Sequence, residues 1–126
     1  PPAHLGRRLA REELTLLSFG EARADPARRT MSGQVVSIDH FGNLLTNIHQ
    51  EAYRAVFPPH ALAQGAVRIK GQVVEFYPSY GSVAPGSLLA LFGSRGYLEI
   101  AVNQGHAARL LDAACHDPVE VFSRPG

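Results

Sequence analysis

Short apolar runs separated by glycine and proline dominate the chain after residue 33. In residues 66–70 the apolar Val67 and Ile69 alternate with basic side chains, a period of two that is typical of a half-buried β-strand. Five further apolar runs have the β-branched and aromatic composition of strands and are bounded by turn residues. They span residues 33–39, 73–77, 87–92, 97–102 and 118–122. The pattern therefore predicts about six strands.

Helical spacing is confined to two segments of this part of the chain. The clearer one places apolar residues from Ala107 to Ala114 on one face, which predicts a helix near residues 106–114. A second short helix is expected near residues 50–56. Closely spaced strands with turn signals between them favour an antiparallel β-barrel or sandwich over a parallel α/β sheet. We therefore expect a mainly β fold, a small antiparallel barrel-like domain with short helices, preceded by a short helical and linker segment.

The first 32 residues differ from the rest, because they carry six of the chain's arginines and four of its acids. Residues 4–19 show an imperfect helical spacing of leucines, which predicts a short helix. Residues 20–33 are charged, contain Pro26 and lack apolar periodicity, so we expect an exposed linker there. A chain of 126 residues is long enough for one domain with a core. We divide it into a residual N-terminal segment and linker, residues 1–32, and a β-barrel domain, residues 33–126.

Charge and composition argue against several classes of function. The net charge is +1 and only one of the twelve basic residues is a lysine, so a surface that grips nucleic acid through its phosphates is not expected. An apolar run of about 18 residues and a signal-peptide pattern are both missing from the sequence, so we expect no membrane partner. The scattered histidines and the single Cys115 predict neither a metal site nor an internal disulfide. We expect a cytoplasmic protein.

The stretch SIDHFGNLLTNI, residues 37–48, places an acid, an aromatic ring, a glycine and two asparagines in a segment that otherwise has the composition of a strand. One interpretation is structural: a turn at Gly42, with Asn43 and Asn47 as turn or cap residues. The other is that these side chains bind a flat, polar ligand. A side-chain amide has a donor and an acceptor at the spacing of the N6 and N7 edge of adenine. The residues of this stretch alone leave both interpretations open.

Two further motifs follow along the chain, SYGSVAPG at residues 79–86 and GSRGYLEIAVNQGHAARLL at residues 93–111. Together with residues 37–48, in this order and spacing, they resemble the C-terminal domain of the S-adenosylmethionine hydroxide adenosyltransferases. That family is related to the fluorinating and chlorinating S-adenosylmethionine enzymes. The strings IDHFGNLLTNI and GYLEIAVNQGHA are long and specific, and the resemblance covers nearly all of residues 33–122.

The resemblance implies a two-domain enzyme of which this chain is the C-terminal, adenosine- and methionine-binding half. In that family water or hydroxide displaces methionine at the 5′-carbon of S-adenosylmethionine, which releases adenosine and L-methionine. S-adenosylmethionine is then the substrate, and no cofactor is expected. The family also implies a homotrimer in which the C-terminal domain of one subunit covers the N-terminal domain of its neighbour. The N-terminal domain holds the water-activating residues, so we expect no catalytic residue in this chain.

The resemblance assigns residues to the adenosine half of the ligand. Asn43 matches the position that contacts adenine, and Phe41 and Tyr80 match the aromatic wall around the nucleoside. Backbone groups around three consecutive residues are expected to complete the adenine edge: Val102, Asn103 and Gln104. For Asn103 a structural alternative stays open, because it could cap a helix before Gly105.

The resemblance also assigns residues to the methionine half. Asp39 matches the acid that pairs with the α-ammonium group. Ser94 and Arg95 match a pair that contacts the same half, with Arg95 offering its guanidinium to a carboxylate. Many hydroxide-transferring members of the family have no arginine after that serine. A half-site must present its polar groups to a partner domain, so these side chains and the adenosine-contacting ones are expected to converge on one exposed face.

Two functions of other classes remain as alternatives. One is a stand-alone module that binds S-adenosylmethionine or adenosine without turning it over. The other is a trimer-forming piece without a ligand. A long N-terminal α/β pattern, which the resemblance requires for catalysis, is not present in this sequence. Whether the chain acts as an enzyme, and whether water or halide is the nucleophile, therefore depends on a partner domain.

Overall fold

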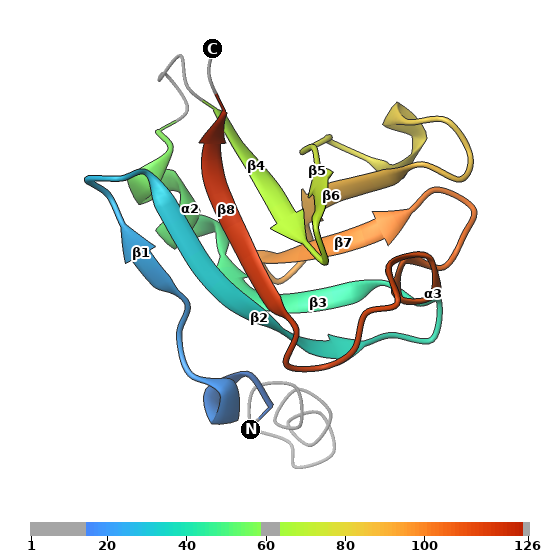
Figure 1. Ribbon diagram of the computed structural model, residues 1–126, viewed down its shortest axis with the longest axis horizontal. Helices are drawn as coiled ribbons and strands as arrows, with labels where there is room; N and C mark the ends of the chain where they lie inside the picture. Colours follow the sequence, from blue (N-terminus) through green and yellow to red (C-terminus); the bar gives the residue numbers. More distant parts are fainter. Residues whose placement is uncertain (1–14, 59–63, 125–126) are drawn as a thin grey trace.

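The computed structural model describes residues 15–58 and 64–124. The helix predicted over residues 4–19 lies mostly outside the described residues, although residues 15–19 are helical. Within the described residues, eight strands form one sheet (Figure 1). They are β1 (Arg23–Asp25), β2 (Thr30–Ile38), β3 (Leu44–His49), β4 (Gln64–Ile69), β5 (Gln72–Val74), β6 (Leu88–Phe92), β7 (Tyr97–Val102) and β8 (Pro118–Arg124). Between them lie α2 (Gln50–Val56), the 3-10 turn η1 (Tyr80–Ser82) and α3 (Ala107–Leu111).

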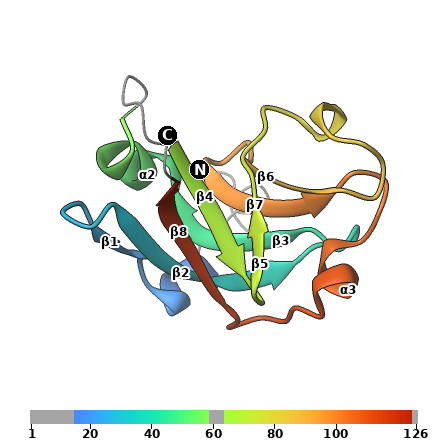
Figure 2. The same ribbon diagram turned by 45° about the horizontal axis from the view of Figure 1, so that its top comes forward.

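The strands pair antiparallel in the order β5-β4-β8-β2-β3-β7-β6, with β1 beside β2. The two ends of this order meet, because the chain after β5 forms a parallel bridge to β6 between Phe76 and Ala90. The Ala90 amide donates to the Glu75 carbonyl at 2.8 Å, and the Tyr77 amide donates to the Ala90 carbonyl at 2.9 Å. Figure 2 shows β5 beside β6 where the sheet closes. The prediction of a small, mainly antiparallel barrel-like domain is confirmed.

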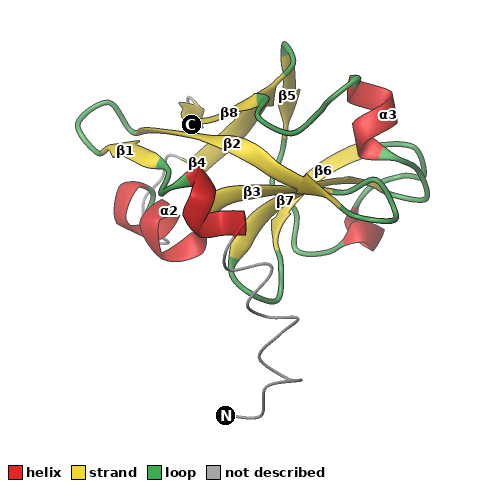
Figure 3. Ribbon diagram, turned by 90° about the horizontal axis from the view of Figure 1, so that it is seen from below, coloured by secondary structure: helices red, strands yellow, loops and turns green. Residues whose placement is uncertain are grey.

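Alternating side chains of the strands fill the interior of the barrel. Val67 and Ile69, which the period-two pattern assigns to one face of β4, are both buried. Leu98 and Ile100 of β7 are buried in the same way, and the alternate side chains of Tyr97 and Glu99 are partly exposed on the outer face. α2 and α3 lie at opposite ends of the sheet (Figure 3). The core therefore sits inside the sheet, and the outer faces of the strands are available for other contacts.

Both predicted helices are present, as α2 and α3. A histidine precedes each helix as its N-cap residue, His49 for α2 and His106 for α3. The Nδ1 atom of each histidine accepts a hydrogen bond of 3.1 Å from a backbone amide of the helix. Such an acceptor satisfies one of the first N–H groups of a helix, which have no partner within the helix. Because His106 caps α3, the alternative that Asn103 caps this helix is wrong.

Most of residues 20–33 are exposed, as predicted, but they hold β1 and the first part of β2, so the prediction of a linker there is wrong. From Thr30 to Gln34 this segment pairs with β8, and the Met31 side chain is buried in the core. Its order comes from a strand at the far end of the chain, which a local pattern of charges and prolines does not reveal. The position along the chain at which the domain begins stays a prediction.

Two β-bulges interrupt the strands that carry the SIDHFGNLLTNI motif. In β2 the register shifts between Val35 and Ser37, and both Val35 and Val36 are buried. In β3 the Thr46 hydroxyl donates to the Leu98 carbonyl at 2.9 Å, within the segment where the β3–β7 register shifts. β3 was not among the six predicted strands, although residues 37–48 have the composition of a strand.

Candidate functional site

Residues 39–43 form a tight loop between β2 and β3. The Asp39 carboxylate accepts three hydrogen bonds: from the Phe41 amide at 2.8 Å, from the Asn43 amide at 2.9 Å and from Asn43 Nδ2 at 3.2 Å. Gly42 has a φ of +84°, in the left-handed region that glycine adopts without strain. Its carbonyl accepts a 3.0 Å bond from an amide of α3. The loop is therefore ordered by its own acid and anchored on α3.

β2, β3 and β7 present alternate side chains on the outer face of the barrel, and a hollow of about 250 Å³ lies across them. Four of the predicted ligand-binding side chains line it: Asp39, Asn43, Ser94 and Arg95. The first two come from the β2–β3 loop and the other two from the turn between β6 and β7. The rest of the lining consists of Leu16, Ser37, Leu45, Tyr97 and Glu99. The structure thus brings together two motifs that are far apart in the sequence.

The two aromatic residues of the predicted site differ in position. Burial, followed by the negative charges of Glu99 and Asp39, raises the pKa of Tyr80 above 10.0, so its hydroxyl lies within electrostatic reach of both acids. Phe41 is 71% exposed, and its ring meets the His40 ring edge-on at a centroid distance of 5.7 Å. Neither ring lines the hollow, but the charges of two acids that line it act on Tyr80, and Phe41 belongs to the loop that forms one wall.

The residues predicted at the adenine edge lie at the C-terminal end of β7. Val102 is buried, and Gln104 is exposed with a positive φ of 55°. Asn103 Nδ2 donates to the Val83 carbonyl at 2.8 Å, so this side chain braces the loop that carries Tyr80. None of the three lines the hollow, which the β6–β7 turn borders at the opposite end of β7. Their role through backbone groups stays a prediction.

Glu99 lines the hollow but is not among the site residues predicted from the sequence. It stands opposite Leu45 in the β3–β7 pairing. A methyl group on Gly93 would overlap the Glu99 carboxylate, so this side chain lies across the β6–β7 turn. Burial, and then the negative charge of Asp39, raise the pKa of Glu99 above its ordinary value of 4.5. The available signal was the alternation of polar and apolar residues along β7, which assigns Glu99 to the outer face.

Replacing Glu99 by Gln is expected to raise the free energy of unfolding at about pH 7. Because the pKa of Glu99 in the folded chain lies above the ordinary value of 4.5, the folded chain binds this proton more tightly than the unfolded chain does. Ionisation therefore destabilises the fold increasingly as the pH rises from 4.5 through the raised pKa, and below 4.5 this effect is absent. Urea unfolding should show a gain for Glu99→Gln at about pH 7 that disappears at about pH 4. An equal gain at both pH values would contradict the electrostatic cause.

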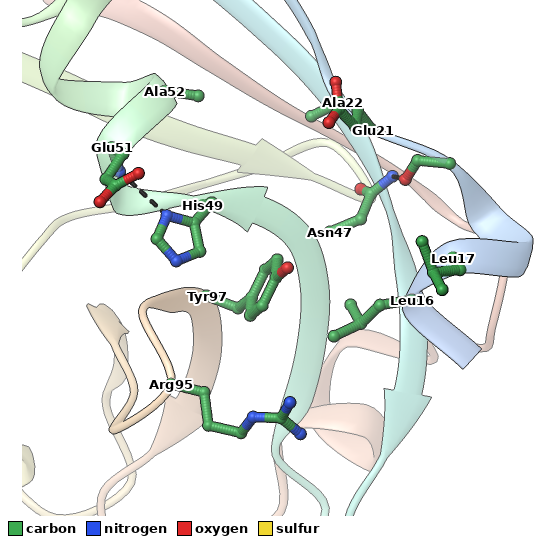
Figure 4. A pocket seen from close by; sticks show the side chains of 11 residues that line it. Leu16, Leu17, Glu21, Ala22, Asn47, His49, Glu51, Ala52, Arg95 and Tyr97 are labelled. Atoms are coloured by element: carbon green, nitrogen blue, oxygen red, sulfur yellow. Dashed lines mark hydrogen bonds between the residues drawn. The ribbon is translucent and has the colours of Figure 1, made fainter. Parts of the chain in front are cut away.

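A larger hollow of about 670 Å³ adjoins the first one and is bordered by the helical residues 15–19, β3 and α2. The two hollows share the side chains of Leu16, Arg95 and Tyr97. Figure 4 shows the Arg95 side chain extending past the Tyr97 ring toward Leu16. Leu16 is only 8% exposed, so the helical residues 15–19 pack onto the outer face of the barrel at this boundary.

Asn47 borders the larger hollow, but both ends of its amide bind backbone groups. Its Oδ1 accepts from the Gln34 amide at 2.9 Å, and its Nδ2 donates to the Gly20 carbonyl at 3.0 Å. The side chain is 7% exposed. Asn47 thus ties the segment before β1 to the sheet from within β3, and the interpretation of this residue as a turn or cap residue is wrong.

Among residues 15–58 and 64–124, no group of three or more His, Cys, Asp and Glu side chains is placed to hold a metal ion. In the same ranges, no helix combines the length and apolar character needed to cross a membrane. The hollow combines two carboxylates, a guanidinium, hydroxyls and an amide on one outward face. The fold and this face define a small β-barrel domain with a polar surface suited to a charged organic ligand.

Comparison with known families shows which family of β-barrel domains this chain belongs to. The sequence model of the SAM hydroxide adenosyltransferase C-terminal domain, where SAM is S-adenosylmethionine, matches residues 33–120. The chain belongs to this family. The match includes the β2–β3 loop and the β6–β7 turn, the two segments that meet at the hollow.

Two curated relatives are named (R)-S-adenosyl-L-methionine hydrolase. The one from Thermus thermophilus is 31% identical over 122 residues, which are 97% of this chain and 42% of the relative. The one from Salinispora tropica is 30% identical over 110 residues, which are 87% of this chain and 40% of the relative. This chain therefore spans about two fifths of the length of these relatives.

Solved structures agree on the fold. An uncharacterized conserved protein from Thermotoga maritima superposes with a TM-score of 0.68 at 28% identity, over 81% of this chain and 38% of that one. A conserved hypothetical protein from Thermus thermophilus superposes with a TM-score of 0.59 at 32% identity, over 72% of this chain and 34% of that one. In both cases the barrel of this chain corresponds to one part of a longer protein.

Proposed function

We propose that this chain is the C-terminal half of an enzyme that hydrolyses S-adenosylmethionine to adenosine and L-methionine. The family match and the name of both curated relatives support this proposal. The chain spans about two fifths of those relatives, so the proposal requires an N-terminal catalytic domain from the same or a neighbouring subunit. We refer to this chain joined to such a domain as the assembled enzyme.

The observation that carries the proposal is the meeting of two motifs at one outward-facing hollow. Asp39 and Asn43 reach it from one loop, and Ser94 and Arg95 reach it from another. Polar side chains with a purely structural role are more often satisfied in the core or spread among separate turns. A shallow polar face that a second domain covers excludes water and strengthens electrostatic contacts with a ligand.

Each half of the substrate has a set of candidate side chains. For the methionine half, the set supplies negative charge, a hydroxyl and a guanidinium that can bind a carboxylate through two hydrogen bonds. It consists of Asp39, Ser94 and Arg95. For the adenosine half, the set supplies an amide for the adenine edge and aromatic rings for its faces. It consists of Asn43, Phe41 and Tyr80, with backbone groups at residues 102–104.

The chemistry demands little of this chain beyond binding. The sulfonium of S-adenosylmethionine is already a good leaving group, so the protein has mainly to align water with the 5′-carbon and to exclude bulk solvent. In the proposal the N-terminal domain activates the water, and this chain forms the opposite wall of the pocket. A homotrimer with the pocket between subunits, in the cytoplasm, completes the proposal.

The isolated chain is expected not to release adenosine from S-adenosylmethionine at a useful rate, because alignment and electrostatic stabilisation need both walls of the pocket. The assembled enzyme is expected to release adenosine and methionine in equal amounts. Chromatography of the products from both proteins checks this. Turnover by the isolated chain would show that the catalytic groups lie in this half.

Two further measurements on the same proteins would distinguish the alternatives. Calorimetric binding of S-adenosylmethionine or adenosine by the isolated chain, with no turnover by the assembled enzyme, would favour a binding module. Trimers in light scattering, with neither binding nor turnover, would favour a trimer-forming piece.

A further inference from the structure

Each of the two loops that border the hollow rests one glycine against a histidine ring. A methyl group on Gly42 of the β2–β3 loop would overlap the His106 ring, and one on Gly96 of the β6–β7 turn would overlap Nε2 of the His49 ring. Both glycines have a positive φ, of +84° and +88°, which glycine adopts without strain. The absence of a side chain thus lets each ring lie directly on the backbone of a loop that carries site residues.

The helices that these histidines cap also bind the backbone of the two loops. The Ala108 amide, in the first turn of α3, donates to the Gly42 carbonyl at 3.0 Å. The Gln50 amide, at the start of α2, donates to the Gly96 carbonyl at 2.7 Å. The first N–H groups of a helix have no partner within the helix, and here the loop glycines supply one. Each loop is therefore held at two points, by a backbone hydrogen bond and by a ring contact.

The helix caps fix the orientation of both rings. Nδ1 of His106 accepts from the Arg109 amide, and Nδ1 of His49 accepts from the Glu51 amide, each at 3.1 Å. Figure 4 shows the second of these bonds. The His49 ring also meets the Tyr97 ring edge-on, at a centroid distance of 4.8 Å. Turning either ring away from its glycine would break the bond at Nδ1, so each histidine couples a helix cap to the position of a site loop.

We propose that His49 and His106 are positioning residues, which hold the two loops of the hollow in the geometry that binds the substrate. The inference rests on the proposed function. His106 holds the loop that carries Asn43 and Phe41, the candidates for the adenosine half. His49 holds the turn that carries Ser94, a candidate for the methionine half. The loop and the turn lie at opposite ends of β3, so each histidine acts on its own part of the ligand.

Calorimetric titration of the assembled enzyme with S-adenosylhomocysteine and with adenosine tests this inference. S-adenosylhomocysteine has a thioether in place of the sulfonium, so it persists during the measurement. Asparagine can cap a helix through its side-chain oxygen but places no ring on the glycine, so both Asn variants should unfold near the urea midpoint of the unchanged enzyme. His106→Asn is expected to weaken both ligands by about 10-fold, because small misplacements of contact groups are costly. His49→Asn is expected to weaken S-adenosylhomocysteine by about 10-fold and adenosine by less than about twofold.

Two further variants make the test specific. His106→Phe keeps a ring for the contact with Gly42 but removes the acceptor that caps α3. It is expected to lower the urea midpoint and yet to keep more adenosine affinity than His106→Asn does. His116→Asn is the matched control, because this histidine stacks on Phe19 at a centroid distance of 4.6 Å and lines neither hollow. Its φ of 76° is one that asparagine tolerates, so both affinities should stay unchanged.

The outcomes separate the inference from the function on which it rests. If the unchanged enzyme binds both ligands and the two Asn variants bind them equally well, the inference is overturned while the proposed function stands. If His49→Asn weakens both ligands by the same factor, or if His106→Phe loses more adenosine affinity than His106→Asn, the histidines have only a structural role and the inference is again overturned. If the unchanged enzyme binds neither ligand, the proposed function fails and the inference fails with it.

Discussion

Replacing Gly42 by Ala is expected to lower the free energy of unfolding by about 2 to 4 kcal/mol. The φ of +84° at this position strains any residue with a Cβ atom. A methyl group there would also overlap the His106 ring, whose Nδ1 caps α3 through the Arg109 amide. The ring has to move, so the variant weakens the helix cap as well as the loop. Urea denaturation of the purified variant measures the loss.

Gly86→Ala is the matched control for this prediction. Gly86 has nearly the same backbone conformation, with a φ of +86°, but an added methyl group meets no atom within 4 Å. Its substitution is expected to cost about 1 to 2 kcal/mol, the effect of the backbone conformation alone. Equal losses for the two variants would show that the contact between Gly42 and His106 contributes nothing to stability.

Asn47→Ala is expected to lower the free energy of unfolding by about 1 to 3 kcal/mol. The substitution leaves the Gln34 amide and the Gly20 carbonyl without their side-chain partner and opens space in a buried part of β3. It should also release the segment before β1 from the sheet. Urea denaturation reports the first effect, and faster amide exchange near Gly20 reports the second. Unchanged exchange there would contradict the anchoring role of this side chain.

Asn43→Ala provides the contrast, because the two asparagines belong to the same motif and differ in environment. The Asn43 side chain makes one hydrogen bond, to the exposed Asp39, so its loss should cost less than about 1 kcal/mol of stability. In the assembled enzyme, the proposed contact with adenine predicts that S-adenosylmethionine binding weakens by about 1 to 3 kcal/mol. Unchanged affinity for the substrate would remove Asn43 from the proposed site.

Features that depend on neighbours in the sequence were predictable. The alternation in residues 66–70 identifies β4, and the apolar spacing near Ala107 identifies α3, because a strand or helix repeats its side-chain directions over a few residues. The motif strings supply the family without any structure, and the family match over residues 33–120 confirms that assignment. Local signals also indicate the turn at Gly42, where the backbone conformation favours glycine.

Features that depend on a partner elsewhere in the chain were not predictable in this way. β1 and the start of β2 have the composition of a linker, and they are ordered because β2 pairs with β8. Asn103 has the surroundings of a helix cap in sequence, yet its amide binds the Val83 carbonyl across a loop. The sequence around Asn47 suggests a turn residue, but its side-chain amide accepts a hydrogen bond from the Gln34 amide and donates one to the Gly20 carbonyl.

The sequence by itself determined the fold class, the family and the two motifs at the hollow, because these follow from periodicity and from specific strings of residues. Only the tertiary structure decided which of those residues meet. In the tertiary structure, one hollow is lined by Asp39 and Asn43 from one loop and by Ser94 and Arg95 from another. The register of β3 against β7 also places Glu99 in this hollow. Register depends on bulges and on contacts between distant strands, and shifting it by one residue would turn Glu99 from the hollow into the core.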